Sequence, residues 1–126
     1  MAIEHTDLDK EIRAAVQAHD AWNRRLTTAI NLGSCETAPE DIAVDHKCDF
    51  GKWLYGDDLD AETKNGKPFT VTKRLHADFH NVAARVADLA EQGKKAEAYT
   101  LLDGEYSFAS SKLMRALTKW RGELEL

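Results

Sequence analysis

The stretch Val71 to Leu89, VTKRLHADFHNVAARVADL, decides the fold class of this protein. Its large apolar residues follow one another at steps of three and four: Val71, Leu75, Phe79, Val82, Val86 and Leu89. Such steps place side chains on one face of an α-helix, which completes a turn every 3.6 residues. The turn-rich segment NGKPF precedes the stretch and Gly93 follows it, so the sequence predicts one long amphipathic helix.

Two further stretches show the same period. The first carries Leu8, Ile12, Val16, Trp22, Leu26 and Ile30, with Asp7 as the predicted N-cap and Gly33 as the predicted end. The last carries Tyr99, Leu102, Tyr106, Ala109, Leu113, Ala116, Trp120 and Leu124. Helices with one apolar face must pack against each other, as they do in a helix bundle.

The segment from Gly33 to Pro68 has no long periodic pattern. It contains one short apolar cluster, Phe50, Trp53, Leu54 and Tyr55, spaced like one or two turns of helix. No stretch alternates between apolar and polar residues as a half-buried strand does. We therefore expect an all-α protein: a four-helix bundle of three long helices plus one short helix carrying the Cys48 motif, in a single domain over residues 1–126.

Composition excludes several classes of function. The formal net charge of −5 lacks the basic excess that nucleic acid or an anionic membrane surface would require. The first residues, MAIEHTDLDKEIRAA, contain no apolar run that resembles a signal sequence or a membrane span. We expect a cytoplasmic protein with no nucleic-acid or membrane partner. In that compartment Cys35 and Cys48 are free or metal-bound rather than disulfide-bonded.

His76 and His80 are the first candidate metal ligands. They stand four residues apart, so their rings lie on the same side of the predicted helix and could share one ion. They flank Phe79 and neighbour Leu75 and Ala83, which places them at the predicted margin of the apolar face. The alternative is a pair of solvated histidines without a ligand.

His19 and Cys48 complete the candidate set. His19 lies on the apolar stripe of the first helix, where it is either a hydrogen-bonded core residue or a ligand. Cys48 is either a small buried apolar residue or a thiolate ligand. Three imidazoles and one thiolate suit zinc, which prefers tetrahedral nitrogen and sulfur donors. We expect all four to converge on one zinc ion in the interior.

Other histidine, cysteine and aspartate residues are not expected to bind the metal directly. His46 could substitute as a ligand, but we interpret it as a loop residue, and we interpret Cys35 as a loop thiol without chemistry. Metal-bound imidazoles usually donate their second N–H to an oriented acceptor. The candidates for that acceptor, from their position beside the ligands in sequence, are Asp20, Asp49 and Asp78.

Two other chemistries were weighed against zinc binding. A ferritin-like di-iron site needs Glu-x-x-His pairs, but the residues three before His19, His76 and His80 are Val, Lys and Ala. A cysteine–histidine hydrolase would use Cys48 as its nucleophile and would need an open site. A zinc ion held by four protein ligands leaves no vacancy for a water molecule. We therefore expect no enzyme activity.

Three motifs together resemble the chemoreceptor zinc-binding domain family. They are AHDAW around His19, CDFGKWLYG from Cys48 and HADFH around His76 and His80. The resemblance implies a homodimeric four-helix bundle that holds one zinc per protomer through three histidines and one cysteine. Carried onto this chain, the implied ligands are His19, Cys48, His76 and His80.

The resemblance also implies regulation rather than turnover. Members of the family are attached to chemotaxis receptors or to diguanylate cyclases, which make cyclic di-GMP, and some sense hypochlorous acid through the zinc-bound cysteine. We expect a zinc-binding sensor whose output partner is such a module, and whose switch is the release of the Cys48 segment when one ligand is lost. The alternative is a structural, zinc-stapled dimerisation module without a sensing role.

Overall fold

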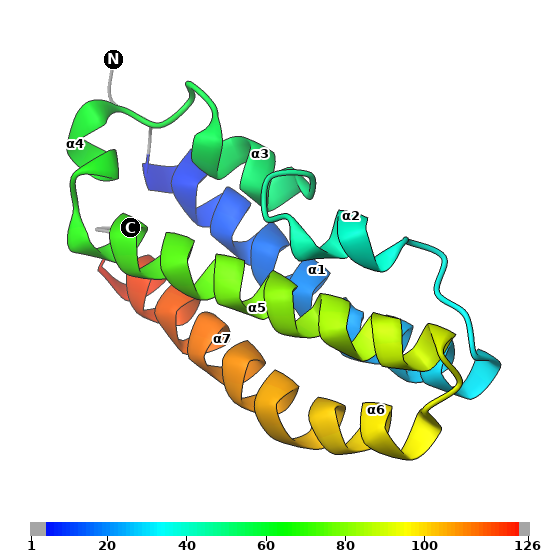
Figure 1. Ribbon diagram of the computed structural model, residues 1–126. Coiled ribbons are helices and arrows are strands. Elements are labelled where there is room, and N and C mark those ends of the chain that lie inside the picture. Colours follow the sequence, from blue (N-terminus) through cyan, green and yellow to red (C-terminus); the bar gives the residue numbers. More distant parts are fainter. Residues whose placement is uncertain (1–4, 124–126) are drawn as a thin grey trace.

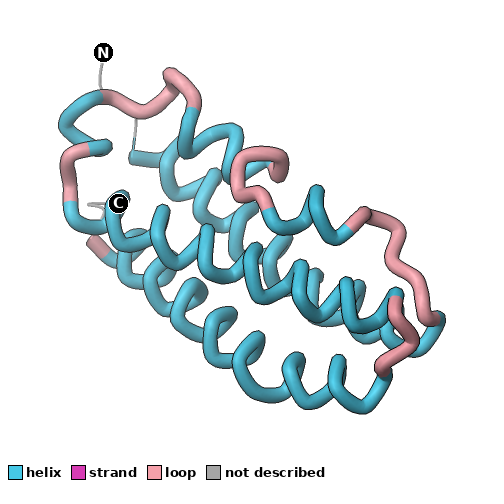
Figure 2. Tube along the Cα trace, in the orientation of Figure 1, coloured by secondary structure: helices cyan, strands magenta, loops and turns pink. Residues whose placement is uncertain are grey.

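The protein is all-α in the computed structural model, which describes residues 5–123 and shows no strand among them (Figures 1 and 2). Two long helices, α1 (His5–Leu32) and α5 (Lys67–Glu91), lie alongside a third helical segment. That segment runs without a break through α6 (Lys95–Leu101), the π-helix η1 (Leu102–Tyr106) and α7 (Ser107–Gly122). The predicted all-α class is confirmed for the described residues.

Helix α1 begins earlier than the sequence predicts. Asp7 lies in its first turn rather than at the N-cap, so the predicted start was wrong. The predicted end is correct, because Gly33 has a φ of +77° and its N–H donates to the carbonyl of Ala29 at 2.8 Å. A left-handed residue after the last turn is a common way to satisfy the final carbonyls of a helix, and glycine adopts it without strain.

Helix α5 buries a face slightly rotated from the predicted one. Its start has Pro68 in the first turn, where a missing N–H costs no hydrogen bond, and it ends before Gly93 at a φ of +74°. Leu75 and Leu89 of the predicted stripe are only half-buried. The centre of the buried face holds Thr72, His76, Phe79, Ala83, Val86 and Ala90.

The third helical segment contains a feature that the sequence did not indicate. Between Leu102 and Tyr106 the backbone forms one π-helical turn, in which the Ser107 hydroxyl donates to the Leu102 carbonyl at 2.9 Å. One extra residue in a turn shifts the register of everything that follows. After it, Leu113 and Trp120 of the predicted stripe are buried together with Leu117, whereas Ala109 and Ala116 are half-buried. The predicted end at Leu124 lies outside the described residues.

The segment between α1 and α5 forms three short helices where the sequence predicted one. They are α2 (Pro39–Ala43), α3 (Asp49–Tyr55) and α4 (Ala61–Lys64), joined by the loops in Figure 2. Helix α2 packs on α5 and α3 packs on α1. Ile42 of α2 and Phe50, Trp53 and Leu54 of α3 join the core. The segment therefore forms a cover along one side of the long helices.

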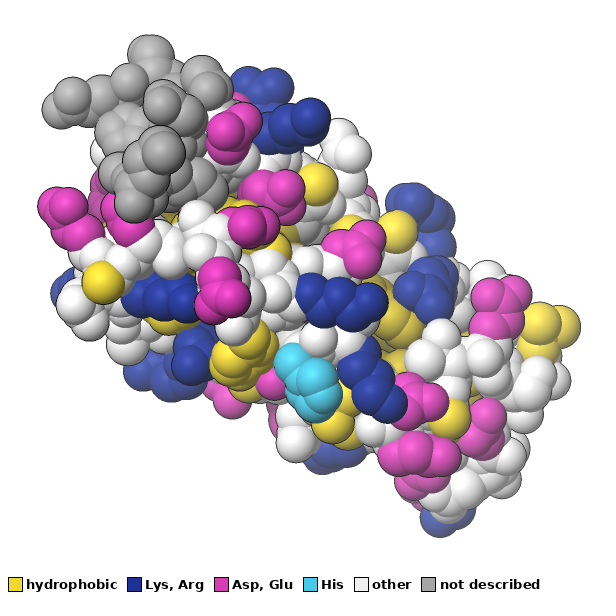
Figure 3. All heavy atoms as spheres, turned by 90° about the horizontal axis from the view of Figure 1, so that it is seen from above, with side chains coloured by type: hydrophobic (Ala, Val, Ile, Leu, Met, Phe, Trp, Pro, Cys, Tyr) yellow, Lys and Arg dark blue, Asp and Glu magenta, His cyan; other side chains and the backbone are white. Residues whose placement is uncertain are grey.

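The surface mixes charges of both signs. Figure 3 shows Lys and Arg side chains interspersed with Asp and Glu on the face it presents, with no continuous basic area on that face. At one end Asp9 of α1 accepts a hydrogen bond from Arg121 of α7 at 2.6 Å, which ties the two helices together. Asp9 also forms an ion pair with Arg13 of its own helix at 2.9 Å. Among the described helices, none combines the length and the apolar character that crossing a membrane requires.

Candidate metal centre

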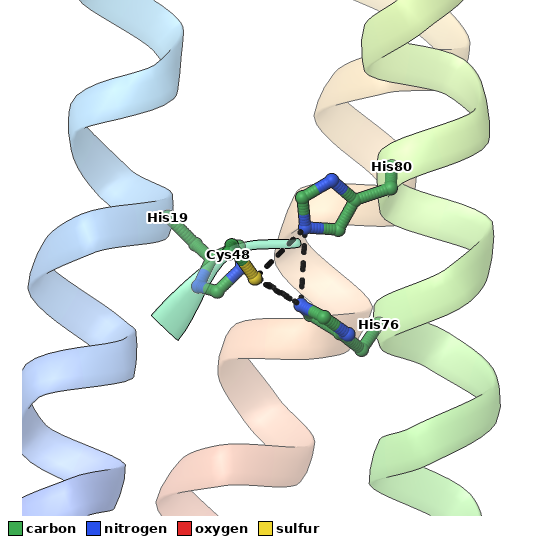
Figure 4. Close-up of side chains that lie close together, drawn as sticks. All are labelled: His19, Cys48, His76 and His80. Atoms are coloured by element: carbon green, nitrogen blue, oxygen red, sulfur yellow. Dashed lines mark hydrogen bonds between the residues drawn. The ribbon is translucent and has the colours of Figure 1, made fainter. Parts of the chain in front are cut away.

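Four side chains from three segments meet inside the protein (Figure 4). His19 comes from α1, Cys48 from the residue that caps α3, and His76 and His80 from α5. One ligand atom of each lies within 4.8 Å of those of the other three. The structure therefore brings together the four residues that the sequence singled out.

The spacing of the four donor atoms is tight. The His76 Nε2 lies 3.0 Å from the Nε2 of His19 and 3.0 Å from that of His80. The Cys48 Sγ lies 3.3 Å from the His76 Nε2 and 3.5 Å from the His80 Nε2. Two nitrogens bound to one tetrahedral zinc at its usual bond lengths are roughly 3.3 Å apart. These four donor–donor distances are therefore close to those of a tetrahedral zinc site, and all of the distances are within 4.8 Å.

His19 is buried as predicted, but the two α5 histidines are more deeply buried than the sequence predicts. His19, His76 and His80 have relative exposures of 1%, 0% and 3%. The prediction that the α5 pair sits at the margin of the apolar face was wrong, because His76 lies at its centre while Leu75 is half-buried. A reading of α5 that counts only large apolar residues misplaces the face, since small residues such as Ala83 and Ala87 also lie on it.

Hydrogen bonds to backbone carbonyls determine which nitrogen of two rings carries the proton. The His19 Nδ1 lies 2.7 Å from the Ala15 carbonyl oxygen, and the His80 Nδ1 lies 2.9 Å from that of Ile42. A carbonyl only accepts, so Nδ1 must be the donor in both rings. In the neutral form each Nε2 then presents a lone pair toward the cluster, as a metal ligand must.

His76 has no hydrogen bond of this kind. Its Nδ1 is buried without a hydrogen-bond partner among the described residues, and the nearest carboxylate is Asp45, whose Oδ2 lies 4.0 Å away. The Tyr55 hydroxyl donates to the same Oδ2 at 2.6 Å. The Asp45 carboxylate therefore lies on the Nδ1 side of His76, close to hydrogen-bond distance but beyond it.

Sequence reasoning missed Asp45. It proposed Asp20, Asp49 and Asp78, which are exposed, and none of them is hydrogen-bonded to a ligand ring in the described part of the chain. Asp45 stands three residues before Cys48 in a loop, where spacing along the chain does not tell which way a side chain points. The loop that folds back over Gly51 is what brings its carboxylate beside His76, and this is a tertiary feature.

The cluster has only weak hydrogen-bond donors for its inward-facing nitrogens, which fits a metal cation. Two of the three Nε2 atoms are lone-pair acceptors, and the third can donate to only one of them. The other available proton is that of the Cys48 thiol, a weak donor that lies 3.5 Å from the His80 Nε2. Burying such facing acceptors is costly unless a donor or a cation lies between them. Soft sulfur and imidazole nitrogen are donors that zinc prefers. The residues present therefore fit a zinc ion.

Burial also shifts the protonation equilibria toward neutral groups. It lowers the pKa of His19 to about 4, and together with the neighbouring His80 it lowers the pKa of His76 to about 2. Burial lowers the pKa of His80 as well, and it raises the pKa of the Cys48 thiol. The imidazoles are thus ready to bind a metal at neutral pH, whereas the thiol must lose its proton when it binds one.

Gly51 allows the Cys48 loop to close. Its N–H donates to the Cys48 Sγ at 3.3 Å, and its backbone lies against that of Asp45 and His46. A Cβ at this position would lie 1.8 Å from the Asp45 carbonyl oxygen. Gly51 thus permits a close approach between α3 and the loop that precedes it.

Aromatic rings surround the cluster. Phe50 makes edge-to-face contacts with the rings of His76 and His19, at centroid distances of 5.2 and 5.9 Å, and Trp53 stacks on Phe50 at 5.7 Å. Phe79 contacts His19 from α5 at 5.2 Å. Phe50 and Trp53 are buried, as expected for residues that anchor the Cys48 segment to the core.

The remaining histidine and cysteine candidates lie outside the cluster. His46 is exposed, although it stands only two residues from Cys48. Cys35 is half-buried against the core near the end of α1. Both are therefore suitable as matched controls for the four clustered residues.

The fold and this cluster define a class: a helical protein with a buried site of three imidazoles and one thiol that could hold zinc. The chain belongs to the chemoreceptor zinc-binding domain family, whose model matches residues 19–87 and so spans His19, Cys48, His76 and His80. This is a family of regulatory sensor domains rather than of enzymes. Neither the curated proteins nor the solved structures include a match to this chain.

Replacing Gly51 by alanine tests the loop closure. We expect Gly51→Ala to lower the free energy of unfolding by about 2 kcal/mol, because the new methyl group overlaps the Asp45 carbonyl and the loop must shift. Urea unfolding followed by circular dichroism measures the change. The control is Gly122→Ala in α7, where a Cβ meets nothing within 4 Å. Equal stability of the two variants would contradict the close approach.

The buried histidines predict acid sensitivity of the metal-free protein. Their pKa values are lower in the folded than in the unfolded state, so the unfolded state binds more protons below its pKa of roughly 6.5. Stability is fully present above that pH and falls as the pH drops toward 4. We expect chelator-treated protein to lose about 2 kcal/mol of unfolding free energy per buried histidine between pH 7 and pH 5. Urea titrations at each pH measure it.

The exposed His46 provides the matched control. His46→Gln should retain the same loss, because its imidazole is exposed in the folded protein. A metal-free protein whose stability is flat from pH 7 to pH 5 would show that the three clustered imidazoles are not buried as neutral groups.

Proposed function

We propose that this protein is a zinc-binding regulatory domain in which His19, Cys48, His76 and His80 hold one zinc ion. The observation that carries the proposal is the convergence of three Nε2 atoms and one Sγ within 4.8 Å in the core. Membership of the chemoreceptor zinc-binding domain family supports the choice of metal. The proposed output partner is a chemotaxis receptor or a module that makes cyclic di-GMP.

The proposed architecture follows the family. Residues 1–126 form a single domain, a four-helix bundle in which the α2–α3 segment packs as the fourth member beside α1, α5 and the α6–α7 segment. The cytoplasm is the proposed location and a homodimer the proposed assembly. Exposed Phe108, at 59% relative exposure, is consistent with a surface that a second copy covers.

The proposed signal is the state of the Cys48 donor. A bound zinc ion would hold the Cys48 sulfur as a thiolate, which is the form that oxidants attack. The chain's own residues support that state: the Gly51 N–H donates to the sulfur, and the Ala15 and Ile42 carbonyls hold two of the rings. Loss of zinc, or two-electron oxidation of the sulfur to a sulfenate, would remove the link between the Cys48 loop and α5.

Metal analysis tests the proposed ligands. We expect about one zinc per chain in protein purified without chelator, and a loss of most of it in Cys48→Ser and His76→Gln, because removing one of four donors weakens a tetrahedral site strongly. Inductively coupled plasma mass spectrometry gives the zinc content. The same samples give the mass in solution, which tests the proposed dimer.

Two controls separate ligand loss from a general effect of substitution. Cys35→Ser and His46→Gln change the same residue types outside the cluster and should retain the parent's zinc content. A parent without zinc, or controls that lose as much zinc as the ligand variants, would overturn the proposed site.

Hydrogen exchange tests the proposed switch. The Cys48 loop is linked to α5 through the cluster, whereas α3 is also anchored by buried Phe50, Trp53 and Leu54. We therefore expect zinc removal to speed amide exchange most at residues 44–49 and less at residues 50–55. Mass spectrometry of zinc-loaded and chelator-treated protein measures it. Unchanged exchange over residues 44–55 would contradict the release of this segment.

One observation favours a second function, a structural zinc staple for a dimer. Three of the four ligands are at most 3% exposed, and such burial favours slow exchange of the metal. Sensor and staple differ in reversibility, since a sensor must lose or modify its donor under physiological conditions. The rate at which isotopically labelled zinc exchanges into the loaded protein separates them.

A further inference from the structure

A solvent-connected cavity of about 530 Å³ adjoins the metal centre. It lies between α1 and the chain from Thr37 to Phe50, and its lining includes three of the four clustered residues: His19, Cys48 and His80. His76 does not line it. The cavity therefore reaches the cluster from one side only.

Small residues on α1 keep this cavity open. Ala14 and Ala18 stand one turn apart, so both face the cavity, and both are exposed. The aromatic rings of Trp22 and Phe50 form part of its wall. A larger side chain at Ala18 would fill space that the native sequence leaves free.

Polar contacts hold the two sides of the cavity at a set separation. On one side the Arg25 guanidinium lies 3.7 Å from the centre of the Trp22 ring and donates to the Thr37 hydroxyl at 3.2 Å, joining α1 to the chain before α2. On the other, Lys47 pairs with Asp41 at 2.6 Å, joining the Cys48 loop to α2. These contacts link the segments on either side of the cavity opening to each other.

The four clustered side chains differ in how much of their surface is exposed to solvent. Cys48 is half-buried, whereas the three histidines are at most 3% exposed. A molecule that enters from solvent thus reaches the sulfur before it can contact the imidazole nitrogens.

We propose that this cavity is the route by which small thiol-directed electrophiles reach the Cys48 sulfur, and that it excludes macromolecular reagents. The proposal rests on the proposed function for its biological meaning, since it assigns the class of molecule that would act on a zinc-bound Cys48. What it adds is the path through this chain, along Ala14 and Ala18 of α1, and the size limit that the path sets.

Alkylation of zinc-loaded protein tests the route. In a Cys35→Ser background Cys48 is the single thiol. Iodoacetamide is the small probe: an S–C bond forms at the Cys48 Sγ, the C–I bond breaks, and iodide leaves with the electron pair. Mass spectrometry measures the alkylated fraction with time, and a colorimetric indicator measures released zinc. The large probe is the same haloacetamide group on a polymer of about 5 kDa.

The structure predicts how the rates change when the cavity is filled. Ala18→Trp should slow the reaction with iodoacetamide by about tenfold or more, because access to a thiol limits its rate. The polymer-linked reagent should react slowly with every folded variant. The matched control is Ala96→Trp, an exposed alanine in α6 that does not line the cavity, and it should react like the parent.

The experiment tests the access route independently of the proposed zinc site. If Ala18→Trp does not fold, as judged by circular dichroism, Ala14→Leu fills the same cavity with a smaller group. Undiminished alkylation in a folded cavity-filled variant, or equal rates for both probes, overturns the route even when zinc is bound. A parent without zinc overturns the proposed function, while the alkylation rates still decide the route.

Discussion

The structure depends on one constraint: three imidazoles and a thiol lie within 4.8 Å of one another in a protein core. Two of the rings donate Nδ1–H to backbone carbonyls, so their lone pairs point inward at the same small volume. Buried acceptors that face each other are unfavourable unless a positive centre lies between them. A cation bound by all four side chains would remove that cost. For this reason we interpret the cluster as a metal site rather than as a set of core histidines.

Several local features follow from that constraint. The loop before α3 must fold back tightly to bring its sulfur to α5, and only a residue without a Cβ fits where Gly51 meets the Asp45 carbonyl. The same loop conformation places the Asp45 carboxylate 4.0 Å from the His76 Nδ1, and the Tyr55 hydroxyl donates a hydrogen bond to that carboxylate. The cluster thus brings α1, α5 and the covering segment together through four side chains.

Much of the fold was predictable because the relevant signals are local. The steps of three and four along α1, α5 and the α6–α7 segment reflect burial of one face, and Gly33 and Gly93 end helices through a conformation that glycine adopts easily. The misses have non-local causes. Asp7 is not a cap, the π-helical turn before Ser107 has no sequence signature, and the burial of α5 centres on small residues that a count of large apolar ones ignores.

By itself the sequence determined the helices, the family and the four candidate donors, since residue spacing along a helix and a short motif around Cys48 carry that information. Only the tertiary structure decided that these donors meet and which ring nitrogen faces inward. It also decided that Asp45, rather than an aspartate beside a ligand in sequence, lies near His76, and that a cavity reaches the sulfur. The reason is physical: hydrogen-bond partners and cavities form between segments that are far apart in the chain. A local sequence pattern does not specify how close two such segments lie in the folded protein.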